Sequence, residues 1–294
     1  MTNELTDQLA ADWSAQLLAE GYCLIPDLLP AETIAALDGD LARDFDQIPF
    51  CEGHFYGEQT KRFGRVLARS PRAAKLVQHE LIIAIVETVL GPWCDCIQLN
   101  LTQAIAVHPG AKAQMPHRDQ DMWRGEDRHM EYLVNVMWPF TDYTRDNGAT
   151  RVWPESHGLR AIAVDESGPF ETPEYGPGSA LLMLGSLLHA AGANMSQHVR
   201  RGMITGYSLG WLNPFENQHL AYPPEVAKAF SPELAALVGY RQHRPNLGNY
   251  EGHCPSVLLA DRPGGLSGAR DALRPDQVEA VARHAFEQGR PLAA

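Results

Sequence analysis

The sequence predicts a mainly β domain with flanking α-helices, built as a double-stranded β-helix, also called a jelly-roll or cupin-like fold. Three observations predict it. Helical patterns fill the first part of the chain, segments with β-type alternation follow Pro92, and turn residues separate these segments. No regular alternation of strands and helices occurs, which argues against a Rossmann fold or a TIM barrel.

The first part of the chain is expected to form helices around one short strand, because its apolar residues recur at helical spacing. The expected elements are helices over 5–20, 31–46 and 71–90, and a strand over 21–26. Gly91 and Pro92 end the last of these helices. The segment 50–69 shows no clear period, so we expect a loop or irregular strands near the site.

After Pro92 the pattern changes to alternating or short apolar segments, which are typical of strands. Strands are expected over 97–107, 132–140, 149–153, 178–188 and 201–212, and helices over 223–239 and 275–288. We find no linker. The chain is therefore expected to be a single domain over 1–294, with a helical part to about residue 92, a jelly-roll core over about 93–215 and a helical extension over 216–294.

Composition restricts the class of partner. The formal net charge is −12 and the isoelectric point is about 5.4, which disfavours nucleic acid or an anionic membrane as partner and leaves a small-molecule substrate. The amino terminus carries acidic residues before any basic one, unlike a signal peptide, and the apolar run 81–90 is interrupted by Glu87. The five cysteines show no disulfide or zinc pattern. We therefore expect a soluble, cytoplasmic protein with reduced thiols.

The segment His117-Arg118-Asp119 is the centre of the predicted site. In an extended backbone, side chains two residues apart lie on the same face, so the imidazole and the carboxylate can bind one metal ion. A second histidine would complete the two-His-one-carboxylate triad of non-haem Fe(II) oxygenases. His189 is the candidate, because it ends an apolar strand and small residues follow it. The alternatives stay open: this short motif also occurs by chance, and His189 can equally be a core histidine.

Arg200 lies eleven residues after His189, at the start of another expected strand. A guanidinium there would suit a dicarboxylate cosubstrate, which needs a charge-assisted partner at its far end. The alternative is that Arg200 is a surface arginine, which its neighbour Arg201 makes plausible. Only one of two adjacent strand residues points inward, so either arginine can be the partner.

These motifs together resemble the phytanoyl-CoA dioxygenase family of Fe(II)/2-oxoglutarate oxygenases, over roughly residues 15–220. Further matching pieces are Pro109-Gly110, His117-Arg118-Asp119-Gln120 with Trp123, Asp146-Asn147-Gly148-Ala149-Thr150, Pro154 with Ser156-His157, Gly210-Trp211-Leu212 and Glu216-Asn217-Gln218. Within the family, the chain looks similar to bacterial and fungal members that oxidise natural products in secondary metabolism. The order of the pieces and their compatible gaps make the resemblance specific.

The resemblance implies a set of site residues. Iron would be held by His117, Asp119 and His189, and 2-oxoglutarate would chelate it, leaving a position for O₂. Arg200 would bind the distal carboxylate of 2-oxoglutarate, with contacts from Gln114 and Thr150, and Trp123 would pack beside the metal. His157 is a rival to His189, but in relatives the Pro-x-Ser-His element is a structural turn.

The resemblance also implies a reaction. With O₂, 2-oxoglutarate would give succinate and CO₂ while a C–H bond of the substrate is oxidised. Halogenating relatives replace the carboxylate ligand with a small residue, whereas Asp119 is present here, so hydroxylation or desaturation is expected. Aromatic and sulfur side chains are expected to line an apolar pocket: Phe50, Phe55, Tyr56, Phe63, Met122 and Trp138.

Two other functions remain as alternatives. A zinc hydrolase could use the same three ligands to activate water, although no HExxH motif is present. A non-catalytic jelly-roll binding protein could keep intact ligand motifs without turnover. The resemblance also allows a homodimer, since relatives are often dimers.

Overall fold

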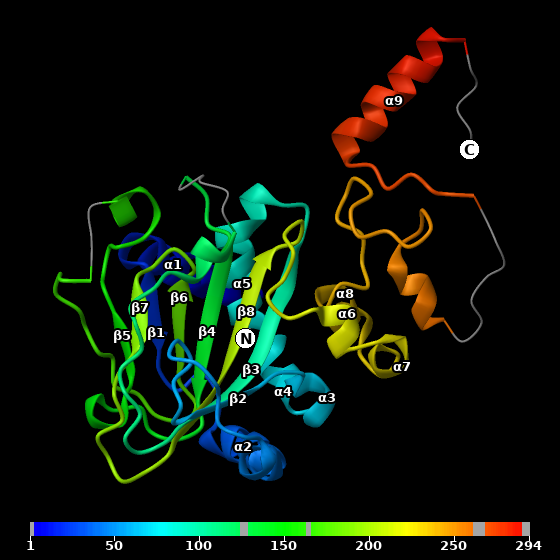
Figure 1. The fold of residues 1–294 in the computed structure, drawn as a ribbon. Helices are drawn as coiled ribbons and strands as arrows, with labels where there is room; N and C mark the ends of the chain where they lie inside the picture. The colour runs from blue at the N-terminus through cyan, green and yellow to red at the C-terminus, as the bar shows by residue number, and fades with distance from the viewer. Residues whose placement is uncertain (1–2, 124–128, 163–165, 261–267, 290–294) are drawn as a thin grey trace.

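The structure is a computed structural model that describes residues 3–123, 129–162, 166–260 and 268–289. Its centre is a six-stranded antiparallel sheet, with helices packed on it and a second, two-stranded sheet beside it (Figure 1). The strands are β1 (Tyr22–Ile25), β2 (Thr60–Phe63), β3 (Ile97–Val107), β4 (Leu133–Pro139), β5 (Thr150–Val152), β6 (Ala180–Leu184), β7 (His189–Ala191) and β8 (Arg200–Leu209).

The α-helices are α1 (Asn3–Glu20), α2 (Ala31–Gln47), α3 (Val66–Arg69), α4 (Ala73–Val77), α5 (Glu80–Leu90), α6 (Gln218–Ala221), α7 (Pro224–Ala227), α8 (Pro232–Leu237) and α9 (Pro275–Glu287). Short 3₁₀ helices are η1 (Gly91–Trp93), η2 (Asp119–Met122), η3 (Arg145–Asn147), η4 (Gly158–Ile162) and η5 (Pro255–Leu259). The mainly β fold with flanking helices expected from the sequence is confirmed.

The large sheet has the strand order β1-β6-β4-β8-β3-β2. Strand β8 lies at its middle, paired with β3 on one side and β4 on the other. The two edge strands, β1 and β2, come from the first part of the chain, which the sequence presented mainly as helical. The small sheet pairs β5 with β7. A cavity between the two sheets is lined by residues of both.

One face of the large sheet is covered by helices. Helix α5 contacts β3 and β8, and α1 packs on α5. The apolar stripe of α5 is buried because it faces the sheet: Leu81, Ile82, Ile85, Val86, Val89 and Leu90. On β8, the hydroxyl of Tyr207 points to this side and donates a hydrogen bond to the Val77 carbonyl at 2.8 Å. The other face of the sheet is thereby left for the cavity.

Two expected helices are divided in the structure. The prediction of one continuous helix over 71–90 is wrong. The backbone of His79 is extended (ψ 120°) and separates α4 from α5. The Tyr207 hydroxyl donates a hydrogen bond to the carbonyl of Val77, the last residue of α4. A contact from strand β8 therefore supports the break between the two helices. The helix expected over 223–239 is two short ones, α7 and α8. Prolines at the first turns of both mark these new starts.

Helix α9 matches the helix expected over 275–288 and stands apart from the sheets in Figure 1. Its apolar side chains Val278, Val281 and Phe286 are exposed. No helix among the described residues is long and apolar enough to cross a membrane. All five cysteines are free.

Candidate metal centre

The backbone brings His117 and His189 together although they are far apart in sequence. The two residues form an isolated antiparallel bridge, with N–H···O distances of 2.9 and 3.0 Å in the two directions. The bridge places His117 beside β7, on the side of β7 that faces away from β5. The extended backbone expected at His117 therefore forms a single bridge and not a longer strand. Asp119 already begins the 3₁₀ helix η2. Arg118 between them is nevertheless extended (φ −118°, ψ 122°), so His117 and Asp119 still point the same way.

The three side chains converge. The Nε2 atom of His117 lies 3.3 Å from Asp119 Oδ1, and Nε2 of His189 lies 3.7 Å from Asp119 Oδ2. The two imidazole rings are 4.5 Å apart between centroids. Among the described residues, these three form the one group of histidine, cysteine and acidic side chains that is close enough to share a metal ion.

Both imidazoles are oriented by backbone carbonyls. The Nδ1 atom of His117 lies 2.9 Å from the carbonyl oxygen of Met115, and Nδ1 of His189 lies 3.0 Å from that of Leu187. A carbonyl only accepts, so each Nδ1 carries a proton and donates, and Nε2 is the atom that can offer a lone pair to a metal ion. This orienting bond is the usual arrangement of metal-binding histidines.

The charges fit a cation. Burial raises the pKa of Asp119, but the nearby His189 and His117 and the hydrogen bond from Asn135 bring it down to about 2, so the group is a carboxylate. Burial lowers the pKa of His189, which favours the neutral imidazole. Two lone pairs and a carboxylate then face one another at close range. A bound cation relieves this convergence of acceptors, so the donor set fits a metal ion such as Fe(II).

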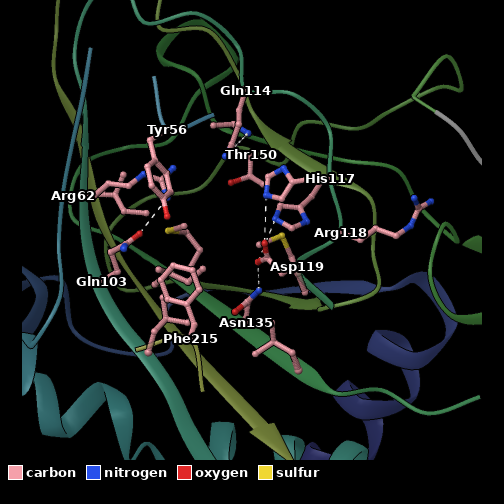
Figure 2. A pocket seen from close by; sticks show the side chains of 18 of the residues that line it. Tyr56, Arg62, Gln103, Gln114, His117, Arg118, Asp119, Asn135, Thr150 and Phe215 are labelled. Carbon is pink, nitrogen blue, oxygen red and sulfur yellow. Dashed lines mark hydrogen bonds and ion pairs between the residues drawn. The ribbon is translucent and has the colours of Figure 1, made fainter. Parts of the chain in front are cut away.

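Asn135 fixes the carboxylate of Asp119. It lies on β4 with no exposed surface, and its Nδ2 donates to Asp119 Oδ2 at 2.7 Å (Figure 2). The motifs of the sequence do not include Asn135. Its signal was a polar residue within the otherwise apolar run Tyr132-Leu133-Val134-Asn135-Val136-Met137, since a buried amide needs hydrogen-bond partners.

A cavity of about 340 Å³ opens beside the three side chains. In Figure 2, Tyr56, Arg62 and Gln103 lie on one side of it, and His117, Asp119 and Asn135 lie on the other. Its apolar wall is formed by Phe55, Leu101, Ile105, Met122, Leu133, Met137, Met183, Ile204 and Phe215. The cavity therefore offers an apolar body with polar groups at a few places, as small-molecule sites do.

The structure separates the two neighbouring arginines. Arg200 lines the cavity with 4% of its surface exposed, donates to the Gly148 carbonyl and lies 4.4 Å from the centre of the Tyr143 ring. Within the described residues it has no ion-pair partner, and its Nε has no hydrogen-bond partner. Arg201 points to the opposite side and pairs with Asp38 of α2 at 2.6 Å. Of these two arginines, only Arg200 is therefore available to an anion in the cavity.

Gln114 and Thr150 also line the cavity, close to each other. The backbone N–H of Gln114 donates to the Ala191 carbonyl at 2.9 Å, and its side-chain oxygen accepts from the Ala191 N–H at 3.3 Å. Thr150 on β5 pairs in register with the same Ala191 on β7. Thr150 thus belongs to the small sheet, and Gln114 is hydrogen-bonded to it at Ala191.

Some other sequence expectations were wrong. Phe55, Tyr56 and Met122 line the cavity, but Phe50, Phe63 and Trp138 do not. Phe63 packs edge-on against Phe45, and Trp138 faces the helix-covered side, where its Nε1 donates to Thr205. Alternation along a strand places Met137 in the cavity and Trp138 behind it.

Trp123 and His157 make other contacts. Trp123 is not among the cavity-lining residues, and its Nε1 donates to the Asn213 carbonyl at 2.9 Å. His157 packs near Gly21, with Nε2 2.9 Å from the carbonyl oxygen of Leu18 at the end of α1. The rival histidine is thus occupied by the helix contact.

Arg62 on β2 is a cavity residue that sequence analysis missed. It donates to Gln103 at 3.1 Å and lies 5.0 Å from the centre of the Tyr56 ring. Burial lowers its pKa. No sequence signal marked it, because the segment 50–69 has no clear period and its strand could not be placed.

Comparison with known proteins agrees with this geometry. The family model described as phytanoyl-CoA dioxygenase (PhyH) matches residues 18–202. The dioxygenase cdmD of Talaromyces verruculosus is 30% identical over 197 residues, which cover 63% of this chain and 63% of that relative. The dioxygenase swnH1 of Arthroderma benhamiae is 28% identical over 274 residues, or 85% of this chain and 89% of the relative.

Among solved structures, the non-haem alpha-ketoglutarate-dependent epimerase SnoN from nogalamycin biosynthesis is similar, with a TM-score of 0.58 and 17% identity. The match covers 69% of this chain and 84% of SnoN. A likeness at this identity supports the fold, and it confirms the jelly-roll architecture expected from the sequence.

Proposed function

Because the chain belongs to the phytanoyl-CoA dioxygenase family, we propose that it is an Fe(II)- and 2-oxoglutarate-dependent dioxygenase of natural-product biosynthesis. The observation that carries the proposal is the convergence of His117, Asp119 and His189 at one end of a cavity that also holds Arg200. Two imidazoles and one carboxylate are the ligand set of non-haem iron oxygenases.

The three convergent residues would hold the iron through their Nε2 atoms and the Asp119 carboxylate. When bound, iron and 2-oxoglutarate supply, with O₂, an oxidant able to attack a C–H bond, and 2-oxoglutarate becomes succinate and CO₂. The protein's contribution is orientation. The Met115 and Leu187 carbonyls keep both Nε2 atoms turned inward, and Asn135 holds the carboxylate, so the ligand set is preorganised.

Arg200 is proposed to bind the distal carboxylate of 2-oxoglutarate. A buried guanidinium with an unpaired Nε is costly without an anion, and a dicarboxylate can provide one. Gln114, hydrogen-bonded to β7, and Thr150 of β5 are proposed to add neutral hydrogen bonds to the cosubstrate. Since Arg200 starts β8 and Thr150 starts β5, rigid strands hold both ends of this subsite.

The substrate is proposed to be a small, largely apolar natural product. The wall of the cavity is mainly Leu, Ile, Met and Phe side chains, which favour an apolar body. The expected reaction is hydroxylation or desaturation of a C–H bond held beside the metal, because Asp119 occupies the position that halogenating relatives leave to chloride.

A spectroscopic and product assay tests the proposal. Purified protein given Fe(II) and 2-oxoglutarate without oxygen should show the weak visible charge-transfer band of the chelate. Air should then yield succinate, and a screen of terpenoids and alkaloids should find compounds that accelerate its release. A protein that binds stoichiometric zinc tightly and shows no band would instead favour the hydrolase alternative. A band without succinate would favour a non-catalytic binding protein.

A further inference from the structure

Two buried asparagines meet at the floor of the cavity. Asn100 on β3 and Asn135 on β4 have no exposed surface, and both line the cavity. Gly206 of β8 lies between them, because β8 pairs with both strands. A Cβ placed on Gly206 would lie 2.5 Å from Leu101 Cδ2, 3.0 Å from Asn135 Oδ1 and 3.5 Å from the Cβ of Asn100. The two asparagines therefore approach the same glycine, against which the end of the Leu101 side chain also packs.

Their orientations are fixed by partners that can act in only one way. The Oδ1 atom of Asn100 accepts from the backbone N–H of Phe215 at 2.9 Å, so its Nδ2 is the remaining donor. The Nδ2 atom of Asn135 donates to the Asp119 carboxylate at 2.7 Å, so its Oδ1 is the remaining acceptor. A flipped amide would place two donors or two acceptors against each other in either case.

Neither remaining atom has a hydrogen-bond partner among the described residues. Leaving a buried polar atom unpaired costs about 1–3 kcal/mol. Two such atoms of opposite kind, on two cavity-lining residues that flank a glycine, form a built donor-acceptor pair. The pairing of β3 with β8 is irregular between Leu99 and Leu101, as in a β-bulge. This irregularity lets Asn100 line the cavity together with its neighbour Leu101.

We propose that Asn100 and Asn135 form a recognition subsite for a neutral substrate group that both accepts and donates a hydrogen bond, such as an alcohol or a lactam. This inference rests on the proposed function, since it names the substrate class of the same cavity. The Asn100 amide donates to the group's oxygen, and the group's O–H or N–H donates to Asn135 Oδ1.

A neutral group suits this place better than an anion. An anion would face the acceptor Oδ1 of Asn135, whereas the arginines that line the cavity, Arg62, Arg118 and Arg200, make their contacts elsewhere. The subsite is also linked to the metal centre, because the same Asn135 holds Asp119. A substrate anchored there is therefore positioned directly beside the proposed iron ligands.

The test uses 2-quinolone and N-methyl-2-quinolone as probes. They share an apolar bicyclic body and a carbonyl, but only 2-quinolone has an N–H to donate. Dissociation constants are measured by ligand-observed NMR on the full chain loaded anaerobically with Fe(II) and 2-oxoglutarate, and again without either. We expect the wild-type chain to bind 2-quinolone about tenfold tighter, since one lost hydrogen bond that leaves a buried group unpaired costs about that factor.

The variant Asn100→Asp keeps the acceptor for the Phe215 N–H and replaces the free donor with an acceptor. It should weaken 2-quinolone binding at least about tenfold. The matched control is Gln103→Glu, which adds the same charge to the same strand and cavity next to Arg62, and it should keep the wild-type preference between the probes. Gly206→Ala, whose methyl group would push against Leu101 and Asn135 Oδ1, should abolish the preference. Thermal unfolding checks that each variant is folded.

The proposal is overturned if the wild-type chain binds both probes equally or binds neither, or if Asn100→Asp and Gln103→Glu weaken 2-quinolone to the same extent. The probe preference measured without iron is independent of catalysis. A chain that prefers 2-quinolone but never releases succinate would therefore contradict the proposed function and keep the subsite. Succinate release without any probe preference would do the reverse.

Discussion

The two faces of the large sheet differ in how their polar atoms are satisfied. On the helix-covered face, the indole N–H of Trp138 donates to Thr205 at 3.2 Å, and the hydroxyl of Tyr207 donates to the Val77 carbonyl at 2.8 Å. On the cavity face, Asn100, Asn135 and Arg200 each keep a buried nitrogen or oxygen without a partner among the described residues. Alternate residues of the same strands therefore face the packed helices on one side and the cavity on the other.

This difference indicates where a ligand belongs. A packed face gains stability only if its buried polar groups are paired within the protein. Unpaired groups on the other face lower stability unless a metal, cosubstrate or substrate completes them. Substitutions on the cavity face should therefore change ligand binding and turnover, whereas substitutions on the helix-covered face should change folding. The following predictions test that division, beginning with the largest effect.

His189→Ala should abolish 2-oxoglutarate turnover, at least about a thousandfold, because it removes one of three proposed metal ligands. Succinate release at saturating 2-oxoglutarate measures this, together with loss of the visible band. The matched variant is His157→Ala, which removes a buried histidine that contacts α1 instead. It should lower the free energy of unfolding but keep turnover per folded molecule. Activity retained in His189→Ala and lost in His157→Ala would reverse the ligand assignment.

Trp138→Ala should lower the free energy of unfolding by about 3–5 kcal/mol, because it opens a large cavity in the packed face. Urea denaturation followed by circular dichroism measures it. The neighbouring Met137→Ala enlarges a cavity that already exists, so it should cost less stability and instead alter which compounds accelerate succinate release. Equal losses of stability in both variants would contradict the division between the faces.

Glu131→Gln should remove a pH dependence of stability. Burial raises the pKa of Glu131 to about 7, against hydrogen bonds from Ser186 that lower it, while the ordinary value is 4.5. Between these values the folded chain holds a proton that the unfolded chain has lost. The free energy of unfolding therefore falls as pH rises through this window, by about 3 kcal/mol in total, and stays low above it.

The glutamine variant stays neutral, so it should match the wild-type chain near pH 4.5 and exceed its stability by about 3 kcal/mol at pH 8. Urea denaturation at both pH values provides the comparison. A wild-type chain whose advantage or deficit relative to Glu131→Gln is the same at the two pH values would show that this carboxyl does not titrate between them.

The class of fold and the three convergent side chains of the site could be predicted from the sequence. His117, Asp119 and His189 were recognisable because short motifs and an apolar strand end place them, and the structure brings these three together. Asn135 and Arg62 were missed for a physical reason. Their positions depend on which strands pair and which face turns inward, and a single strand's pattern does not contain that information.

The same reason explains the divided helix over 71–90, where the hydroxyl of Tyr207 bonds the end of α4 from more than a hundred residues away. It also explains why the sequence left Arg200 and Arg201 undecided. Alternation required that they face opposite sides, but only the pairing of β8 with β3 and β4, and the position of α2, determine which side each one faces.

This adjacent pair gives the smallest effects and the sharpest contrast between the two faces. Arg200→Ala should raise the 2-oxoglutarate concentration needed for half-maximal succinate release by about 30-fold, because a carboxylate in the cavity would lose its buried cation. Arg201→Ala should leave that concentration unchanged and lower the free energy of unfolding by about 1 kcal/mol or less, since its pair with Asp38 is partly exposed. Arg200→Lys should restore only part of the affinity, because an ammonium lacks the planar fork that binds both carboxylate oxygens. If Arg201→Ala raised this 2-oxoglutarate concentration and Arg200→Ala did not, the anion site would lie on the helix-covered face. That result would contradict the division between the two faces of the sheet.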